Sequence, residues 1–158
     1  MDVEWVRVFD AIEQTWVGQT IKESLWYFPA IEAVHLLGLA MLGGAILVVD
    51  LRMLGVGITG QPIAAVARAA NRWLIASIAV LVGTGVLLFV SEAVKCYYNP
   101  SFWVKMSALA LGLVFTFTIR NRIARAERVA PTVYRLVAVL SISVWFVVAA
   151  AGRWIGFS

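Results

Sequence analysis

Charged residues, cysteine and histidine are all scarce in this chain of 158 residues. Only 14% of the residues are charged, and there is one Cys and one His. A single Cys excludes an internal disulfide and a paired-thiol redox centre, and we interpret Cys96 as a loop residue rather than a ligand. The sequence also has no Gly-rich phosphate loop and no Ser/His/Asp set suited to hydrolysis, so neither of these enzyme classes is indicated.

Apolar residues dominate what is present. The chain is 62% hydrophobic with a mean hydropathy of +0.89, which lies outside the usual range for soluble domains. A helix needs about 20 apolar residues to cross a hydrocarbon core of roughly 30 Å, and four stretches are long enough, at residues 26–49, 73–91, 102–119 and 134–155. Because the backbone must satisfy its own hydrogen bonds in lipid, we predict an all-α integral membrane protein with a four-transmembrane-helix bundle over residues 25–158.

The first 24 residues form a more polar segment, too charged for a signal peptide. Apolar residues recur in it at helical spacing, which predicts an amphipathic N-terminal helix over residues 1–24: Trp5, Val8, Phe9, Ile12 and Trp16. This helix either lies on the membrane surface or packs against the rest of the protein or a partner. Its acidic character provides no attraction to anionic lipid, so both alternatives stay open.

Arginines gather in two of the three connections between the spans. They are Arg52, Arg68 and Arg72 after the first span, and Arg120, Arg122, Arg125, Arg128 and Arg135 after the third. Cytoplasmic loops retain such residues, so we expect a multi-pass protein of the bacterial inner membrane with both termini in the periplasm. We interpret the basic cluster at 120–128 as a topology signal and expect no nucleic-acid partner. The lipid bilayer is the expected partner, and a homodimer or larger membrane complex stays open.

Five ionisable residues are predicted to lie in one layer, the periplasmic half of the bundle. They come from all four spans: Glu32, His35, Glu92, Lys105 and Arg153. Ionisable groups within spans are costly unless they face the interior and find partners, so their convergence marks a candidate functional site. At the cytoplasmic end we predict that Asp50 and Arg52 form a structural ion pair or anchor.

Seven glycines are predicted to let the helices approach one another closely, because small residues favour helix packing in membranes. They are Gly38, Gly43, Gly44, Gly83, Gly85, Gly112 and Gly152.

Three motifs carry a resemblance to known families. They are WYFPAIEAVHLLGLAMLGG in the first span, VVDLRMLG at its end and NPSFWVKMSALALGL in the third span. Over residues 25–156 the chain resembles an uncharacterised family of bacterial four-helix inner-membrane proteins, catalogued only as a domain of unknown function. It is more distantly similar to the copper-resistance D-type membrane proteins and to the J-type haem-binding protoporphyrinogen oxidase. In the latter family a histidine and a lysine belong to a haem b site, and the resemblance points to His35 and Lys105.

Three functional interpretations follow. In the first, His35 ligates haem b, while Lys105, Met106, water or the His35 of a second subunit occupies the other face, and cationic residues such as Lys105 and Arg153 offset the propionates. In the second, His35 and Glu32 bind copper or another metal with Glu92 or Met106 as further ligands. In the third, the protein is a non-enzymatic structural or accessory subunit without a cofactor. Enzymatic activity is left undecided.

Glu32 has a specific predicted role in the haem interpretation. It lies three residues before His35, so the two side chains are neighbours on one helix face. A carboxylate there can accept a hydrogen bond from one imidazole nitrogen and leave the other for a ligand. The sequence therefore predicts that Glu32 orients His35.

Overall fold

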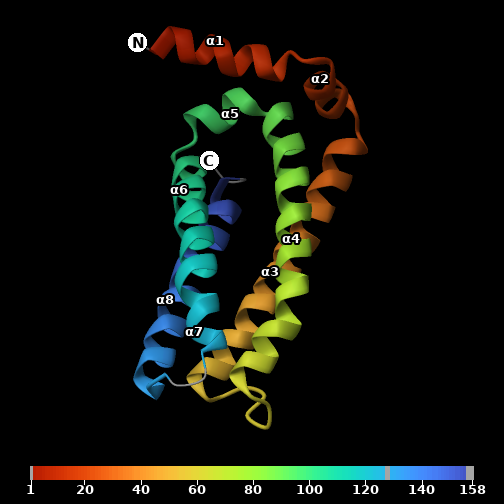
Figure 1. The fold of residues 1–158 in the computed structure, drawn as a ribbon. Coiled ribbons are helices and arrows are strands. Elements are labelled where there is room, and N and C mark those ends of the chain that lie inside the picture. The colour runs from red at the N-terminus through yellow and green to blue at the C-terminus, as the bar shows by residue number, and fades with distance from the viewer. Residues whose placement is uncertain (1, 127–128, 156–158) are drawn as a thin grey trace.

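The computed structural model describes residues 2–126 and 129–155, which form helices and contain no strand (Figure 1). Arg128 and Ser158 lie outside these residues. Three of the four long helices are α3 (Tyr27–Leu54), α4 (Ile63–Ser91) and α8 (Pro131–Trp154). The remaining one joins α6 (Pro100–Phe115), the π-helical turn η1 (Thr116–Arg120) and α7 (Asn121–Arg125). All four are long and apolar enough to cross a membrane, which confirms the predicted all-α fold.

The helices extend further toward the arginine-rich end than the apolar stretches do. α4 begins at Ile63, ahead of the predicted start near Trp73, because its first turns carry polar residues that can remain helical outside the hydrocarbon. Local signals fix other ends. Gly55 ends α3 with φ of 84°, a conformation that favours glycine. The Asn99 side chain caps α6 by accepting a hydrogen bond of 2.9 Å from the Ser101 N–H, and Pro100 occupies the first turn.

The long helices pack as two pairs, α3 with α4 and α6 with α8, and α3 also contacts α8 (Figure 1). Two buried clusters hold the pairs together. One cluster lies at the end where α7 leads back to α8 and comprises Val49, Met53, Val66, Ala67, Ala70, Ala124, Val137 and Ala138. The other lies near mid-bundle and comprises Leu42, Ala45, Ile46, Leu74, Trp145 and Val148.

The half of the bundle on the side of the termini is packed much less tightly. Among residues 27–41, 79–91, 100–111 and 149–154, only Gly38 and Ser91 are buried. The predicted polar layer lies in this half.

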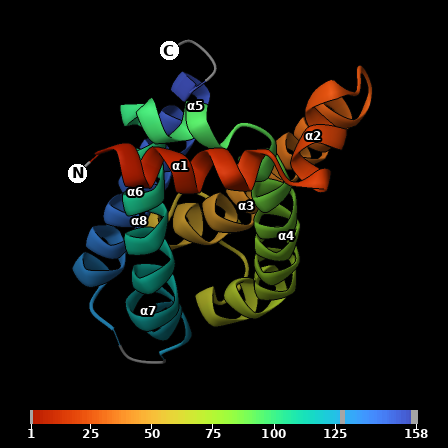
Figure 2. The same ribbon diagram turned by 90° about the horizontal axis from the view of Figure 1, so that it is seen from above.

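Three short helices cover the end of the bundle at which both termini lie. α1 (Asp2–Glu13) crosses this end above α5 (Ala93–Tyr98), and α2 (Trp16–Glu23) leads into α3 (Figure 2). The predicted N-terminal helix is thus divided in two. Phe9 packs against Phe89 and Tyr97, with ring centroids 5.8 and 4.9 Å apart. Of the two alternatives for this segment, packing against the rest of the protein is therefore present in the structure.

Glu13 ties the two N-terminal helices to α5. Its carboxylate pairs with Lys22 and accepts a hydrogen bond of 3.0 Å from the Val94 N–H. At Gly18, a Cβ atom would lie 2.5 Å from the Glu13 carbonyl oxygen and 2.8 Å from that of Val90. Only glycine allows α2 to approach α4 this closely, because the neighbouring atoms belong to the backbone.

The predicted glycine contacts are present at some positions and absent at others. A Cβ on Gly38 would meet Val80 and Leu81 of α4 at 3.1 and 3.3 Å, and one on Gly112 would meet Val144 of α8 at 3.1 Å. Nothing lies within 4 Å of a Cβ built on Gly43, Gly44 or Gly83, so the prediction is wrong for these three. Their faces of the helices are open.

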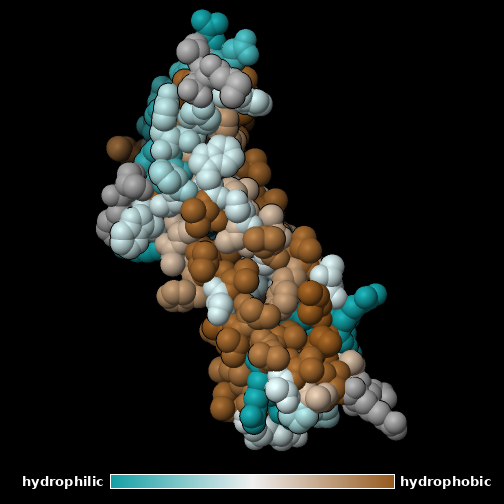
Figure 3. Space-filling model, turned by 90° about the vertical axis from the view of Figure 1, so that its left-hand side faces the viewer, coloured by the Kyte–Doolittle hydropathy of each residue, from teal (hydrophilic) through white to brown (hydrophobic). Residues whose placement is uncertain are grey.

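Apolar side chains form the outer surface of the bundle between its ends. On the face of the molecule shown in Figure 3, hydrophobic groups cover the middle and hydrophilic groups gather toward both ends. This distribution suits a lipid environment, because exposed hydrophobic residues of a membrane-spanning helix contact hydrocarbon rather than water.

Candidate functional site

His35 is held against α4 from its position in α3. Its Nδ1 atom lies 2.8 Å from the Thr84 hydroxyl oxygen, and that hydroxyl donates a 2.6 Å hydrogen bond to the Val80 carbonyl. A hydroxyl has one hydrogen, so when Thr84 donates to Val80 the imidazole must donate from Nδ1 to Thr84. In the neutral imidazole this leaves the Nε2 atom unprotonated, with its lone pair available to a ligand.

Gly85 lets the imidazole lie this close to α4. A Cβ atom at this position would come within 3.4 Å of the His35 Cε1 atom and 3.9 Å of Nδ1. These distances are ordinary van der Waals contacts, so the ring packs against the backbone of α4 at this glycine. The half-buried His35 ring is therefore positioned by the Thr84 hydroxyl and packs beside Gly85.

Lys105 approaches the same layer from α6. Its aliphatic chain runs beside Gly152 of α8, where a Cβ would lie 3.5 Å from Cε and 3.6 Å from Nζ. The ammonium group is close enough to interact electrostatically with His35. In the described part of the chain it makes no hydrogen bond or ion pair. The two residues to which the more distant resemblance points thus lie in the same layer, one from each helix pair.

The remaining predicted residues are arranged differently. Glu32 is exposed and makes no hydrogen bond with His35, so the orienting partner in this structure is Thr84 and not Glu32. Glu92 forms an ion pair of 3.3 Å with Lys95. Met106 is 44% exposed, and Arg153 lies on the exposed side of the last turn of α8.

The described residues do not assemble a ligand set for a bound metal ion. Within residues 2–126 and 129–155, no group of three or more His, Cys, Asp or Glu side chains converges as a metal site would require. The predicted pairing of His35 and Glu32 with Glu92 therefore gains no support from the geometry.

A second polar site lies in the other half of the bundle. Arg120 donates from Nε to Asp50 Oδ1 at 2.7 Å and from Nη2 to the Ile46 carbonyl at 2.8 Å. The exposed fraction of the side chain is 2% for Arg120 and 0% for Asp50. The predicted pairing of Asp50 with Arg52 is wrong, since Arg52 instead donates to the Gln61 carbonyl.

The π-helical turn η1 contains this arginine. A π-turn shifts the register of the residues after it, and such turns occur often at functional sites. Thr116, at the start of η1, accepts a 3.1 Å hydrogen bond from the indole of Trp145. Ser141 faces the Asp50 carboxylate from α8, but its hydroxyl and Asp50 Oδ2 have no hydrogen bond of normal geometry among the described residues. The ion pair of Asp50 and Arg120 is therefore buried, and its carboxylate is incompletely hydrogen-bonded.

Cys96 is a buried residue of α5 and not the loop residue that the sequence predicts. Burial, with the nearby Glu92 charge, raises the pKa of its thiol to about 11. The thiol is therefore protonated at neutral pH and poorly nucleophilic.

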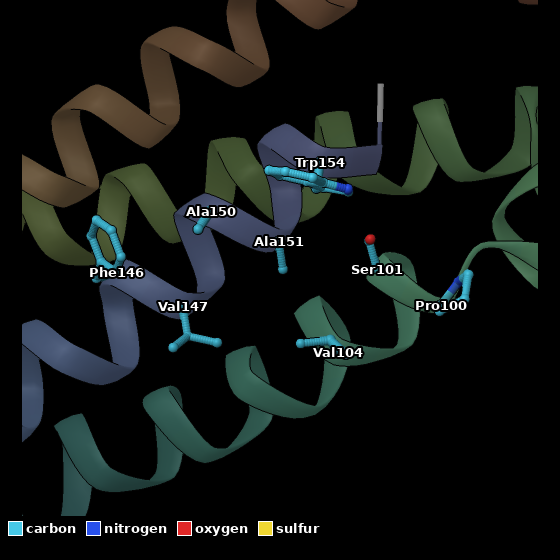
Figure 4. A pocket seen from close by; sticks show the side chains of 8 residues that line it. All are labelled: Pro100, Ser101, Val104, Phe146, Val147, Ala150, Ala151 and Trp154. Carbon is cyan, nitrogen blue, oxygen red and sulfur yellow. The ribbon is translucent and has the colours of Figure 1, made fainter. Parts of the chain in front are cut away.

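Two surface grooves lie apart from His35 and Lys105. The first, of about 340 Å³, runs between α6 and α8, and its lining is mainly apolar (Figure 4): Pro100, Ser101, Val104, Phe146, Val147, Ala150, Ala151 and Trp154. The second, of about 550 Å³, lies between α4 and the η1–α7 segment and is lined by Asn71, Ile75, Phe117, Asn121, Arg122, Arg125 and Ala126.

Comparison with known proteins identifies a family but no characterised relative. No curated protein and no solved structure matches the chain significantly. Residues 8–158 match a family described as a family of unknown function, DUF6644. This match spans α2 to α8 and the second half of α1, so it includes His35, Lys105 and both grooves. The chain therefore belongs to the DUF6644 family of unknown function.

Proposed function

We propose that the protein binds haem b in the loosely packed half of the bundle, with the Nε2 atom of His35 as an axial ligand. The observation that carries the proposal is the hydrogen bond between Nδ1 and Thr84, because it leaves Nε2 with a free lone pair. Axial histidines in metal sites usually donate their other ring N–H to a nearby oxygen, and here that oxygen belongs to Thr84.

The surroundings of His35 suit this group. The Lys105 ammonium lies in the same layer without an anionic partner in the described residues, so it can offset a haem propionate. Few side chains of this half are buried, which leaves surface of all four long helices to contact a large apolar ring. Bound haem would supply one-electron chemistry. The protein's own part is to orient the imidazole, neutralise charge and exclude water.

The second axial position is open to Lys105, water or the His35 of a second subunit. We do not assign Met106 to this position, since it lies one residue after Lys105 on a more exposed face of α6. Copper is less well supported than haem because the predicted metal ligands do not converge.

We further propose that the protein lies in a bacterial inner membrane with both termini in the periplasm. The even number of spans places the termini on one side, and the arginine-rich connections lie at the opposite end. Alkaline phosphatase fused after the C-terminal residue should be active, and the same enzyme inserted after Ala126 should be inactive. The reverse pattern would overturn the orientation and place the His35 site on the cytoplasmic side.

The haem proposal is tested by the visible spectrum of detergent-purified protein expressed with ample haem. We expect a Soret band and a reduced-minus-oxidised difference spectrum, both lost in H35A. T84V retains the shape of the side chain but removes the acceptor for Nδ1. It should keep a band with lower occupancy or a shifted reduction potential.

Two variants serve as matched controls. E32Q should leave the spectrum unchanged, because Glu32 makes no contact with the imidazole. M106L, next to Lys105, should also have no effect, whereas K105M should change the occupancy or the potential. Absence of Soret absorbance in the wild-type protein would refute the proposal. If elemental analysis also shows no copper, zinc or iron, a structural role is the remaining interpretation.

A further inference from the structure

The groove between α4 and the η1–α7 segment has the residues of an anion site at its polar end. Arg122 and Arg125 line it from α7, Asn121 lies beside them, and Asn71 lies opposite on α4. Its volume of about 550 Å³ is within the range of sites that bind small molecules.

The polar groups of this groove are nearly all hydrogen-bond donors. Arg122 and Arg125 form no ion pair with an acidic residue in the described part of the chain. The Asn121 carbonyl oxygen already accepts a 3.3 Å hydrogen bond from Arg120 Nη1, which leaves its NH₂ group for an acceptor. Guanidinium groups have no acceptor at all and match the oxygens of a phosphate. The chemistry of the site therefore favours an anion.

Both walls of the groove change from polar to apolar side chains toward the membrane interior. On α4, Ile75 lies one turn beyond Asn71 toward the membrane interior; on the opposite wall, Phe117 lies about one turn before Asn121. Ile75 and Phe117 are 52% and 46% exposed. A free inorganic anion would use only the polar end, whereas a molecule with an anionic head and apolar chains would contact both parts.

The depth of the groove also matches a lipid headgroup. Trp73 lies two residues after Asn71, is 51% exposed and has the Arg72 guanidinium 5.6 Å from its ring centre. Exposed tryptophan and arginine are typical of the level of the lipid headgroups. We propose that this groove binds one anionic phospholipid, with its phosphate against Arg122, Arg125 and Asn121 and its acyl chains along Ile75 and Phe117. The inference does not depend on haem binding.

Native mass spectrometry of the full chain, released from nanodiscs, tests this proposal. The nanodiscs contain phosphatidylcholine with a minor share of phosphatidylglycerol. We expect one phosphatidylglycerol to be retained per chain, while phosphatidylcholine dissociates. In R122Q/R125Q the affinity for phosphatidylglycerol should fall roughly tenfold or more, since each basic residue at a membrane surface contributes on the order of 1 kcal/mol to such binding.

The matched control is R68Q/R135Q, which removes two exposed arginines from the same end of the bundle but outside the groove. It should retain the lipid as well as the wild-type protein does. Equal losses in both double variants would show a diffuse charge effect and overturn the proposal, as would full retention in R122Q/R125Q. A third arm adds inorganic phosphate to lipid-free protein in detergent. Thermal stabilisation by phosphate equal to that by phosphatidylglycerol would overturn the lipid assignment.

Discussion

The buried pair of Asp50 and Arg120 predicts a large and specific dependence of stability on both side chains. The change D50N keeps the size of the residue but removes its charge. It leaves a guanidinium that is 2% exposed with only neutral acceptors, the Ile46 carbonyl and the Asn121 side chain. Breaking a buried pair by removing one partner costs about 3–5 kcal/mol. We expect the lower part of this range for D50N, because those two acceptors remain.

The reverse change should be more costly. In R120M the fully buried Asp50 carboxylate loses the one charged partner that it has among the described residues, and its Oδ2 atom already lacks a hydrogen bond of normal geometry there. We expect a loss near the upper end of about 3–5 kcal/mol. Replacing both residues in D50L/R120M removes the uncompensated charge, so the double variant should be much more stable than the sum of the single losses predicts.

The free energy of unfolding can be measured in mixed micelles by titration with sodium dodecyl sulfate, using the fluorescence of the seven tryptophans. R52Q is the control, because Arg52 is the partner that sequence proximity suggests but it makes only an exposed hydrogen bond to the Gln61 carbonyl. Its loss should be about 1 kcal/mol or less. The reasoning is refuted if D50N unfolds like the wild-type protein, or if R52Q is as damaging as R120M.

Three further outcomes concern the capped end of the bundle. Burial alone would raise the pKa of Glu13, but its hydrogen bonds with Lys22 and with the backbone, together with the Lys22 charge, lower the pKa below 4.5. Docking of α1 should therefore be stable above about pH 4.5 and weaken as the pH falls below that value. The same contact raises the pKa of Lys22 above 10.5, so the docking of α1 should weaken a second time at still higher pH. Limited proteolysis across the pH range measures both transitions, and E13Q should abolish the acidic one. G18A should cost about 1–3 kcal/mol and increase hydrogen exchange in α2, since its Cβ would clash with two backbone carbonyls; unchanged exchange would contradict the close approach. Cys96 should react slowly with a maleimide at neutral pH until the protein unfolds, and rapid labelling of the folded protein would show that the thiol is not buried as described.

Hydropathy was sufficient to predict the four spans because lipid imposes a strong and simple constraint on length and composition. It was poor at predicting helix ends at the arginine-rich side, where α4 and α7 continue through polar sequence. The amino-acid composition predicts which residues lie within the membrane. Whether a helix continues outside the membrane depends on local propensity and on packing against neighbours.

Pairing between side chains was the least predictable feature. The sequence places Arg52 two residues after Asp50, yet residues two apart on a helix do not face each other, and the actual partner is 70 residues away. The π-helical turn η1, which ends at the buried Arg120, leaves no obvious mark in the sequence. Thr84 was missed for a similar reason. It was visible as a polar residue within an apolar span, but its proximity to His35 follows only from how α3 and α4 cross.

The two halves of the bundle differ in a way that bears on function. From mid-bundle to the arginine-rich end, two apolar clusters and a buried ion pair fix the helices relative to one another. In the other half, α3 and α4 present an imidazole held by Thr84, α6 presents a lysine beside Gly152, and along residues 27–41, 79–91, 100–111 and 149–154 only Gly38 and Ser91 are buried. A membrane protein needs no polar layer to be stable in its loosely packed half, and ionisable groups there are costly. The cost is understandable if the imidazole and the lysine interact with something that the chain itself does not provide, and a redox cofactor with anionic side groups meets both requirements at once.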